Sequence, residues 1–377
     1  MVSRADFPAL IAVLRDEGHR VIGPTVRDGA VVLDDVAGVD VLAAGWGDEQ
    51  EGGRYRLVRR DDGALFGHGA PAQSWKRFLH PPRVRLWRAE GNRDGFTVTD
   101  GAEESPRQAF IGVRACELMA IRIQDKVFHT PTATDPVYAG RRRGAFIVAV
   151  ACGQAGGTCF CASMGAGPAV GPGHDIAVTE LMDGGRHDFL MEAGSDRGAE
   201  VLRRLPGRPA AEADLAAAAN LVRRTAEAMG RTMEADHAAL LRESLRSPHW
   251  ERVAQRCLGC GNCTMVCPTC FCTTVEDTTD LGGTSAERWR LWDSCFTLEF
   301  SYIHGGPVRR QTASRYRQWI THKLSTWHEQ FGTSGCVGCG RCITWCPVGI
   351  DITEETRALG LERRAEQGGG DGSGGGA

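Results

Sequence analysis

The sequence lacks the long apolar runs and the excess of positive charge that mark proteins of membranes or nucleic acids. No stretch approaches the length of uninterrupted apolar residues, about 18, that a membrane-spanning helix needs. The formal net charge is −3 and the sequence pI about 6.4, so we expect no nucleic-acid partner and no anionic membrane surface. The first residues include Asp6 and no apolar core of a secretory signal, which favours a cytoplasmic protein.

Motifs for dinucleotide binding and for hydrolysis are also missing. No G-x-G-x-x-G follows an apolar run, and no P-loop, G-x-S-x-G or H-E-x-x-H occurs. The glycines around 165–168 do not fit the dinucleotide fingerprint, and Pro168 argues against a phosphate-binding turn there. We therefore expect no catalytic residues of the chain's own, and a role in conducting electrons if it carries redox centres.

Cysteine is what the sequence has in abundance, with fifteen in 377 residues. In a reducing cytosol this number indicates metal or redox chemistry rather than disulfides. Eight of these residues form two runs of identical spacing, C-x2-C-x2-C-x3-C-P, the bacterial ferredoxin signature for [4Fe–4S] clusters. The first run is Cys257, Cys260, Cys263, Cys267 and Pro268, and the second is Cys336, Cys339, Cys342, Cys346 and Pro347. Structural zinc usually takes two separated C-x2-C pairs, so the third cysteine of each run favours iron and sulfur.

The fourth cysteine of each run is expected to serve the cluster of the other run, as it does in two-cluster ferredoxins. The first cluster is thus assigned to Cys257, Cys260, Cys263 and Cys346, and the second to Cys336, Cys339, Cys342 and Cys267. Glycines inside each run leave backbone N–H groups free to approach the sulfurs. The closing prolines end the loops, because proline has no N–H and fixes its own φ.

Four further cysteines precede the ferredoxin runs. Cys116 lies in a Gly-Val-Arg-Ala-Cys-Glu segment, and Cys152, Cys159 and Cys161 follow an apolar run that ends at Val150. Four thiols are the number that a third [4Fe–4S] cluster needs. The alternative is that they are buried packing residues, as free cysteines often are. The sequence leaves open whether the chain holds two clusters or three.

The Thr-Cys-Phe-Cys sequence of residues 158–161 recurs at 269–272, directly after the first ferredoxin run. Cys270 and Cys272 form a group with Cys295, but this group has only three thiols. A fourth ligand could be Asp293 or a histidine, and nothing in the sequence selects one, so packing is the default interpretation. Several basic residues nearby either form a solvated face or offset the charge of a thiolate-ligated cluster: Arg309, Arg310, Arg315, Arg317 and Lys323.

The expected fold class is α+β, with an N-terminal α/β domain over 1–205 and a mainly helical two-cluster ferredoxin domain over 249–355. Apolar runs at 30–33 and 145–150 predict strands, and proline or glycine predicts loops at 81–82 and 91–101. Helical spacing of apolar residues over 211–245 predicts an amphipathic helix within a connector, 206–248. We expect helices rather than a small sheet between the ferredoxin runs, and a disordered glycine-rich tail over 356–377.

These segments resemble a known family. The chain is similar, over roughly residues 65–355, to the iron–sulfur beta subunit of soluble cytoplasmic nickel–iron hydrogenases of the sulfhydrogenase type. That family is related to the iron–sulfur electron-transfer subunit of anaerobic sulfite reductase. The resemblance rests on Ser-Trp-Lys-Arg-Phe at 74–78, Gly-Val-Arg-Ala-Cys-Glu at 112–117, the two Thr-Cys-Phe-Cys elements, both ferredoxin runs, and Trp-Asp-Ser-Cys at 292–295 onward to 310.

The resemblance implies an electron-transfer subunit that binds no substrate itself. In the hydrogenases, such a subunit relays electrons between a flavin subunit that handles NAD(P)H and the small and large hydrogenase subunits. In the sulfite reductases, electrons run toward a siroheme subunit. The missing dinucleotide fingerprint agrees with a flavin carried by a partner. Outside the family, the alternative is a free-standing iron–sulfur protein that senses redox state.

Overall fold

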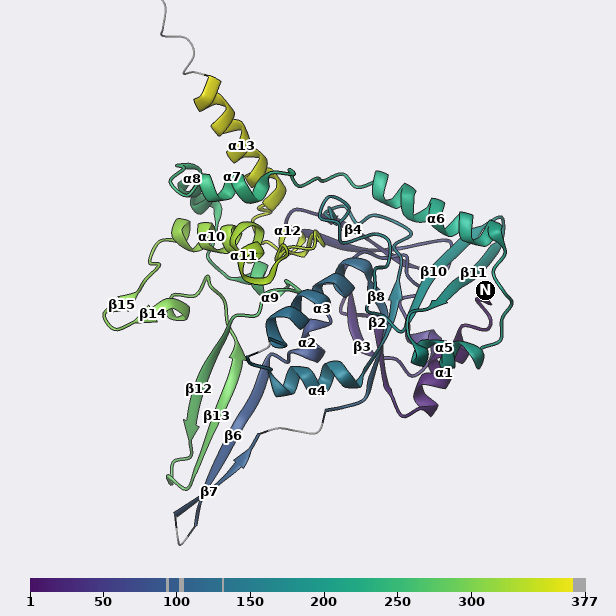
Figure 1. Cartoon of the computed structure of the whole chain (residues 1–377), viewed down its shortest axis with the longest axis horizontal. Helices are drawn as coiled ribbons and strands as arrows, with labels where there is room; N and C mark the ends of the chain where they lie inside the picture. The colour runs from purple at the N-terminus through teal and green to yellow at the C-terminus, as the bar shows by residue number, and fades with distance from the viewer. Residues whose placement is uncertain (93–94, 102–104, 131, 369–377) are drawn as a thin grey trace, which may run out of the picture.

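The computed structural model describes residues 1–92, 95–101, 105–130 and 132–368, and its N-terminal half is built on a seven-stranded sheet (Figure 1). In spatial order the strands are β1 (Val2–Ser3), β11 (Arg186–Ala193), β10 (Ile176–Asp183), β9 (Ala145–Val150), β8 (Gln108–Arg114), β2 (Arg20–Arg27) and β3 (Ala30–Asp35). The four central strands β2, β8, β9 and β10 are parallel, and the outer ones pair antiparallel. β8 and β9 are buried along their whole length, as expected of apolar strands in a parallel sheet covered on both faces.

Helices cover both faces of this sheet because side chains of β9 alternate between them. On one face, α1 (Pro8–Asp16) and α5 (Asp196–Arg203) pack with Phe146 and Val148. On the other, α3 (Ala115–Phe128) and α4 (Pro136–Gly144) pack with Ile147 and Ala149, next to the short α2 (Lys76–Leu79). The predicted strands at 30–33 and 145–150 are therefore present, and the carboxyl ends of β8 and β9 lie side by side.

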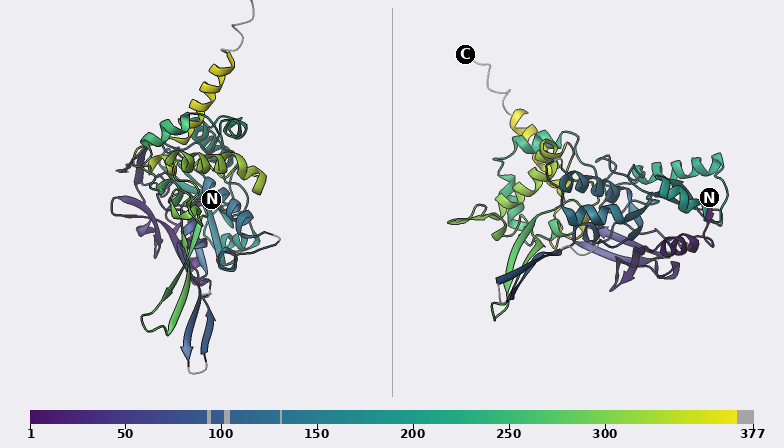
Figure 2. Two further views of the ribbon diagram at one scale, coloured as in Figure 1. Left: turned by 90° about the vertical axis from the view of Figure 1, so that its left-hand side faces the viewer. Right: turned by 60° about the horizontal axis from the view of Figure 1, so that its bottom comes forward.

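A second sheet joins segments from the two halves of the chain. Its four antiparallel strands are, in order, β12 (Thr273–Thr279), β13 (Ser285–Trp292), β6 (Arg83–Asn92) and β7 (Gly95–Asp100), and it projects from the body of the molecule (Figure 2). The prediction of a loop over 91–101 is thus wrong for 91–92 and 95–100. The prediction of helices alone between the ferredoxin runs is also wrong, because β12 and β13 find their partner far away in the sequence.

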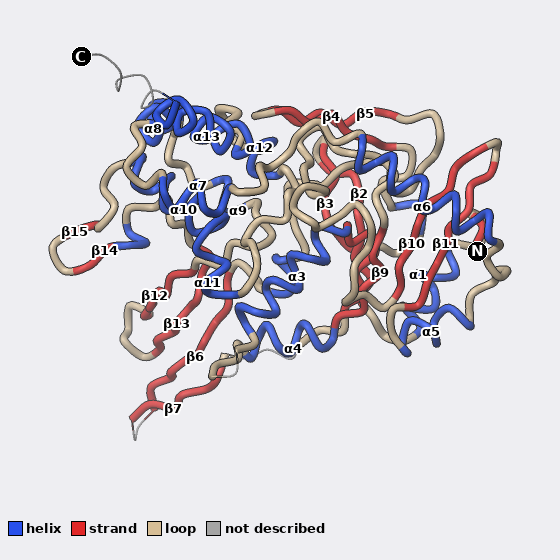
Figure 3. Tube along the Cα trace, turned by 45° about the horizontal axis from the view of Figure 1, so that its top comes forward, coloured by secondary structure: helices blue, strands red, loops and turns tan. Residues whose placement is uncertain are grey.

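The C-terminal half is mainly helical (Figure 3). Its helices are α6 (Glu212–Glu227), α7 (His237–Glu243), α8 (His249–Arg256), α9 (Asn262–Met265), α10 (Thr312–Thr321), the π-helical turn η3 (His322–Thr326), α11 (Trp327–Phe331), α12 (Arg341–Thr344) and α13 (Ile352–Gly368). α7, α8, α10 and α13 enclose one apolar core, against which cysteines of both ferredoxin runs pack. Shorter elements complete the chain: η1 (Val39–Val41), β4 (Trp46–Glu51), β5 (Arg54–Arg59), η2 (Glu299–Ser301), β14 (Tyr302–Ile303) and β15 (Gly306–Pro307).

Two sequence predictions about helices are corrected by the structure. The helix expected over 211–245 is two helices, α6 and α7, separated by 228–236; Gly230 disfavours helix there, and Met233 turns into the C-terminal core. The tail expected over 356–377 is helical as far as Gly368, because Leu359 on α13 packs into that core; the rest of the tail lies outside the described residues. Within the residues described, no helix has the length and apolar character to cross a membrane.

Candidate iron–sulfur centres

The two ferredoxin runs fold into loops of matching geometry. In the first, Gly259 adopts a φ of +64° and its N–H points to the sulfur of Cys257 at 3.4 Å. In the second, Gly338 adopts a φ of +65° and its N–H points to the sulfur of Cys336 at the same distance. Glycine is the residue that adopts this left-handed conformation without strain. Backbone donors aimed at sulfur suit ligands of an iron–sulfur cluster, whose potential depends on such hydrogen bonds.

The fourth cysteine of each run lies beside the other run. Cys346 follows Trp345, whose carbonyl accepts a hydrogen bond from the side chain of Asn262 in the first run. Burial is the main cause of a raised pKa at Cys263, and the charges of Cys257 and Cys346 add to it. α9 and α12, the single helical turns of the two runs, also pack against each other. The exchange of fourth ligands predicted from the spacing is compatible with this arrangement.

Cys267 approaches the second run through a network of hydrogen bonds. The ammonium group of Lys323 donates to the Cys267 sulfur at 3.3 Å and to the carbonyl of Gly335 at 3.2 Å. Thr269 donates to the same carbonyl at 2.6 Å. Because Gly335 directly precedes Cys336, this network fixes Cys267 at the start of the second ferredoxin run.

The second run also packs against the Thr-Cys-Phe-Cys segment of 158–161. The amide of Phe160 donates to the carbonyl of Gly338 at 2.8 Å, and the sulfur of Cys159 lies 3.9 Å from the carbonyl oxygen of Cys339. A Cβ on Gly338 would stand 2.6 Å from the backbone nitrogen of Cys161, so the close approach requires glycine. This contact places the N-terminal cysteines next to the second run.

The N-terminal cysteines, by which we mean Cys116, Cys152, Cys159 and Cys161, gather at one edge of the large sheet. β8 and β9 are parallel neighbours in which Arg114 pairs with Val150. Cys116 lies two residues beyond Arg114, and Cys152 lies two residues beyond Val150. Such an edge, outside the carboxyl ends of parallel strands, is where open α/β sheets bind ligands. A Cβ on Gly167 would contact the sulfur of Cys161 at 3.1 Å and the amide nitrogen of Cys116 at 3.7 Å. The four cysteines are thus brought together by the strand order.

Burial and neighbouring charge oppose ionisation of the buried thiols in this group. Burial, then the charges of Cys161 and Cys339, raise the pKa of Cys116. Burial, then the charges of Cys152 and Cys339, raise the pKa of Cys159 to about 12. A cationic iron core would offset this cost, since it binds the thiolate form.

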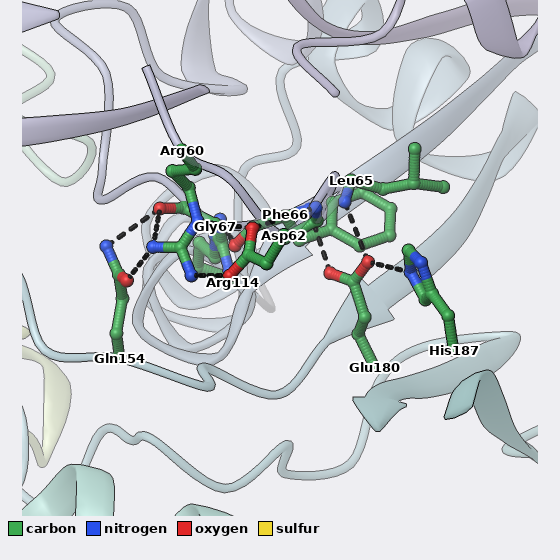
Figure 4. A network of polar contacts seen from close by, with 10 residues as sticks. Arg60, Asp62, Leu65, Phe66, Gly67, Arg114, Gln154, Glu180 and His187 are labelled. Atoms are coloured by element: carbon green, nitrogen blue, oxygen red, sulfur yellow. Dashed lines mark hydrogen bonds and ion pairs between the residues drawn. The ribbon is translucent and has the colours of Figure 1, made fainter. Parts of the chain in front are cut away.

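A polar network holds the loops on either side of the N-terminal cysteines (Figure 4). Arg114, at the end of β8, donates to the carbonyl of Phe66 at 2.8 Å, while Gln154 donates to the carbonyl of Gly67 at 2.7 Å. The carboxylate of Glu180 on β10 accepts from the amide of Phe66 at 2.9 Å. One segment, residues 65–67, is therefore tied to the strand end before Cys116 and to the loop after Cys152.

A buried ion pair connects the N-terminal cysteines with the second run. Arg341, in the second run, lies 2.5 Å from Glu117, which follows Cys116; the two side chains are 0% and 2% exposed. The other carboxylate oxygen of Glu117 accepts from the indole N–H of Trp75 at 3.1 Å. Sequence reasoning named neither charged residue as functional. The sequence did contain one indication of their role: Glu117 directly follows Cys116, and Arg341 directly precedes Cys342.

Single metal ions have no evident site in the described chain. Across 1–92, 95–101, 105–130 and 132–368, no group of three or more His, Cys, Asp or Glu side chains is arranged to hold one ion. A [4Fe–4S] cluster is a larger body that is gripped at four corners, so its thiolates do not converge on one point. The paired loops, sulfur-directed amides and grouped thiols fit clusters of this size.

These features define an iron–sulfur protein. A protein-family model described as a 4Fe-4S dicluster domain matches residues 256–350, so this region binds [4Fe–4S] clusters. The chain belongs to the family of the sulfhydrogenase beta subunit. It is 34% identical over 289 residues to "Sulfhydrogenase 2 subunit beta" of Pyrococcus furiosus, covering 75% of this chain and 82% of that protein. The resemblance drawn from the sequence motifs is thereby confirmed, and no solved structure matches the chain significantly.

Proposed function

We propose that this chain is the electron-transfer subunit of a hydrogenase complex. It relays electrons through [4Fe–4S] clusters between a subunit that binds flavin and NAD(P)H and the small and large subunits of a nickel–iron hydrogenase. The observation that carries the proposal is the relative at 34% identity, named as a sulfhydrogenase beta subunit, together with the match to a dicluster domain. The clusters supply one-electron transfer, while the chain's own residues position and shield them.

The ligand sets of this proposal are those expected from the spacing. One cluster takes Cys257, Cys260, Cys263 and Cys346, and the other takes Cys336, Cys339, Cys342 and Cys267. Support comes from the hydrogen bond between Asn262 and the carbonyl of Trp345 and from the Lys323 network around Cys267. A third cluster is assigned to the N-terminal cysteines, Cys116, Cys152, Cys159 and Cys161, on the strength of their common sheet edge.

The proposed clusters form a short line through the protein. The N-terminal cysteines border the second run through the 3.9 Å contact of Cys159 with the Cys339 carbonyl. The second run borders the first through α9 and α12. Contacts of this kind favour a conductor, because electrons pass readily only between neighbouring centres. The buried ion pair of Glu117 and Arg341 links the N-terminal cysteines to the second run.

The exchange of fourth ligands is tested by a mirrored pair of variants, Cys346→Ala and Cys267→Ala, each in the full chain prepared anaerobically. We expect C346A to damage the cluster held by Cys257, Cys260 and Cys263, and C267A to damage the other. EPR spectra assign each loss, and each variant is the matched control of its mirror image. Loss of the sequence-local cluster in both variants would contradict the assignment.

The partners are tested by anaerobic affinity purification of the tagged chain from its native host. We expect a flavin subunit to co-purify together with a nickel-containing large subunit. A siroheme subunit instead would move the assignment to sulfite reduction, and a chain recovered alone would favour a redox sensor. Iron analysis of this sample and of a variant that lacks the N-terminal cysteines tests the third cluster: a loss of about four irons per chain in the variant supports it, whereas unchanged iron contradicts it, at four per cluster.

A further inference from the structure

A cavity of about 380 Å³ lies beside the segment that directly follows the first ferredoxin run in sequence, and three cysteines line it. We call Cys270, Cys272 and Cys295 the cavity cysteines. Cys270 and Cys272 follow the first run directly, whereas Cys295 follows β13. The two segments are joined by a backbone hydrogen bond of 2.8 Å from the amide of Asp293 to the carbonyl of Cys272. The pairing of β12 with β13 thus brings the three thiols at the base of this hairpin to one cavity wall.

Two buried lysines next to these thiols lack carboxylate partners in the part of the chain that the structure describes. Lys76 and Lys323 are 4% and 3% exposed. The ammonium group of Lys76 donates to the carbonyl of Cys270 at 3.0 Å and lies 3.9 Å from the ring centre of Trp292. The acceptors of Lys323 are a thiol, a hydroxyl and a carbonyl. Burying an ammonium group is costly unless an anion compensates it. Lys323 has the sulfur of Cys267, a proposed cluster ligand, and the cysteines beside Lys76 are the groups that could supply an anion there.

Two tryptophans that line the same cavity also carry indole N–H groups without acceptors. Trp319 and Trp327 are 5% and 1% exposed, and neither N–H has a hydrogen-bond partner among the described residues. Leaving a buried donor without an acceptor is unfavourable. Thiolate and sulfide sulfurs accept hydrogen bonds of this kind in iron–sulfur sites. Positive charge, free donors and thiols thus all indicate an anionic, sulfur-rich occupant.

The structure also selects between the fourth ligands that the sequence left open. Asp293 does not line the cavity, and its carboxylate already accepts from the amide of Ser294 at 2.6 Å and from the hydroxyl of Thr297 at 2.9 Å. His322 does line the cavity; its Nε2 lies 2.9 Å from the side-chain oxygen of Gln330, which leaves Nδ1 as the nitrogen that would bind iron. It begins the π-helical turn η3, and such turns inside α-helices are frequent at functional sites.

We propose that Cys270, Cys272 and Cys295 hold a further iron–sulfur cluster, with His322 as its fourth ligand. This site stands apart from the ligand sets of the proposed function, because none of its four residues belongs to them. It lies close to both ferredoxin runs, since Cys270 contacts Cys267, a ligand of the second cluster, through its thiol. Electrons can therefore reach it from the relay.

The test is the iron and acid-labile sulfide content of the full chain, isolated anaerobically with its native clusters. The triple variant C270A/C272A/C295A is expected to lose about four irons and four sulfides per chain, one cluster's complement. Because this variant leaves the N-terminal cysteines intact, its loss distinguishes the cavity cluster from the third one. Thr273→Ala, which alters the cavity wall without removing a thiol, is the matched control and is expected to keep its iron.

His322→Gln is expected to retain iron but to change the EPR spectrum. Unchanged iron content in the triple variant overturns the proposal. If only the electron-transfer function were wrong, the triple variant would still lose iron, and iron would also be lost from variants of the ferredoxin runs.

A second measurement covers the case in which the triple variant fails to fold. In the wild-type chain, the cavity cysteines should resist iodoacetamide as isolated and react after iron is removed with a chelator, as peptide mass spectrometry can establish. Labelling of the cavity cysteines in the iron-loaded chain would refute the site. So would recovery of Cys272 and Cys295 as a disulfide, or of equimolar zinc in place of iron.

Discussion

The ion pair between Glu117 and Arg341 offers the sharpest test of how the two halves of the chain are joined. Glu117→Gln removes the negative charge but keeps the side-chain shape. Arg341 then remains charged and fully buried, with no carboxylate partner within the described chain; it keeps the backbone carbonyls of Pro71 at 2.6 Å and Gln73 at 3.2 Å and a hydrogen bond with the sulfur of Cys339. Because neither member of the pair is more than 2% exposed, solvent cannot take over the role of the lost carboxylate.

The expected loss follows from leaving one buried charge unpaired. Removing one partner of a buried ion pair typically costs about 3–5 kcal/mol, and removing both partners together costs much less. At a denaturant dependence of about 3 kcal/mol per molar urea, Glu117→Gln should lower the unfolding midpoint by about 1–2 M. The double variant Glu117→Gln/Arg341→Met should regain much of this loss, because no lone charge is buried.

Tryptophan fluorescence during anaerobic urea unfolding measures these midpoints. The control is Glu227→Gln, which breaks an exposed pair with Arg223; those side chains are 61% and 59% exposed, so a change within about 0.5 kcal/mol is expected. Equal midpoints for Glu117→Gln and the control would refute the reasoning. So would a double variant whose loss of stability equals the sum of the losses measured for Glu117→Gln and Arg341→Met separately.

Three further predictions concern single residues. Lys323→Met should lower the reduction potential of the cluster that takes Cys267 by about 65–130 mV in an EPR redox titration. The reason is that a charge-assisted hydrogen bond to sulfur contributes about 1.5–3 kcal/mol, and this is a one-electron couple. Gly338→Ala should lower iron content more than Gly259→Ala does, since both positions have left-handed φ but only the first meets neighbouring backbone at 2.6 Å; equal losses would contradict this. Burial lowers the pKa of His68 to about 3 in the folded chain. On acidification below about pH 6.5, the unfolded chain therefore binds a proton at this histidine that the folded chain does not, and the stability of the fold should fall. His68→Gln should flatten that fall by about 1.4 kcal/mol per pH unit in parallel urea titrations, and an unchanged slope would count against it.

Features that depend on local sequence were predicted well. The apolar run at 145–150 is the buried strand β9, because six consecutive apolar residues suit the middle of a sheet covered on both faces. The [4Fe–4S] character of 256–350 followed from spacing alone, since three thiols at two-residue intervals are the spacing with which a single loop holds one cluster. The exchange of fourth ligands stays a prediction until the mirrored variants are measured.

Features that depend on distant partners were not predictable. The hairpin of β12 and β13 is stabilised by β6, and nothing in residues 273–292 indicates that strand. The helix expected over 211–245 breaks because Met233 packs into a core made by α8, α10 and α13. Glu117 and Arg341 each look like ordinary surface charges in sequence, and only the packing of the second run on the large sheet buries them together.

The pairing of β6 with β13 also affects how the chain is made. Trp87 on β6 faces Arg288 on β13, so about 200 residues must be synthesised before the strand receives its partner. At about 5–20 residues per second, the ribosome needs roughly 10–40 s for that stretch. During this delay one edge of the β6–β7 hairpin is open to pairing with other chains. Arg83, Arg85 and Arg88 on β6 supply the charge that discourages such aggregation of the nascent protein.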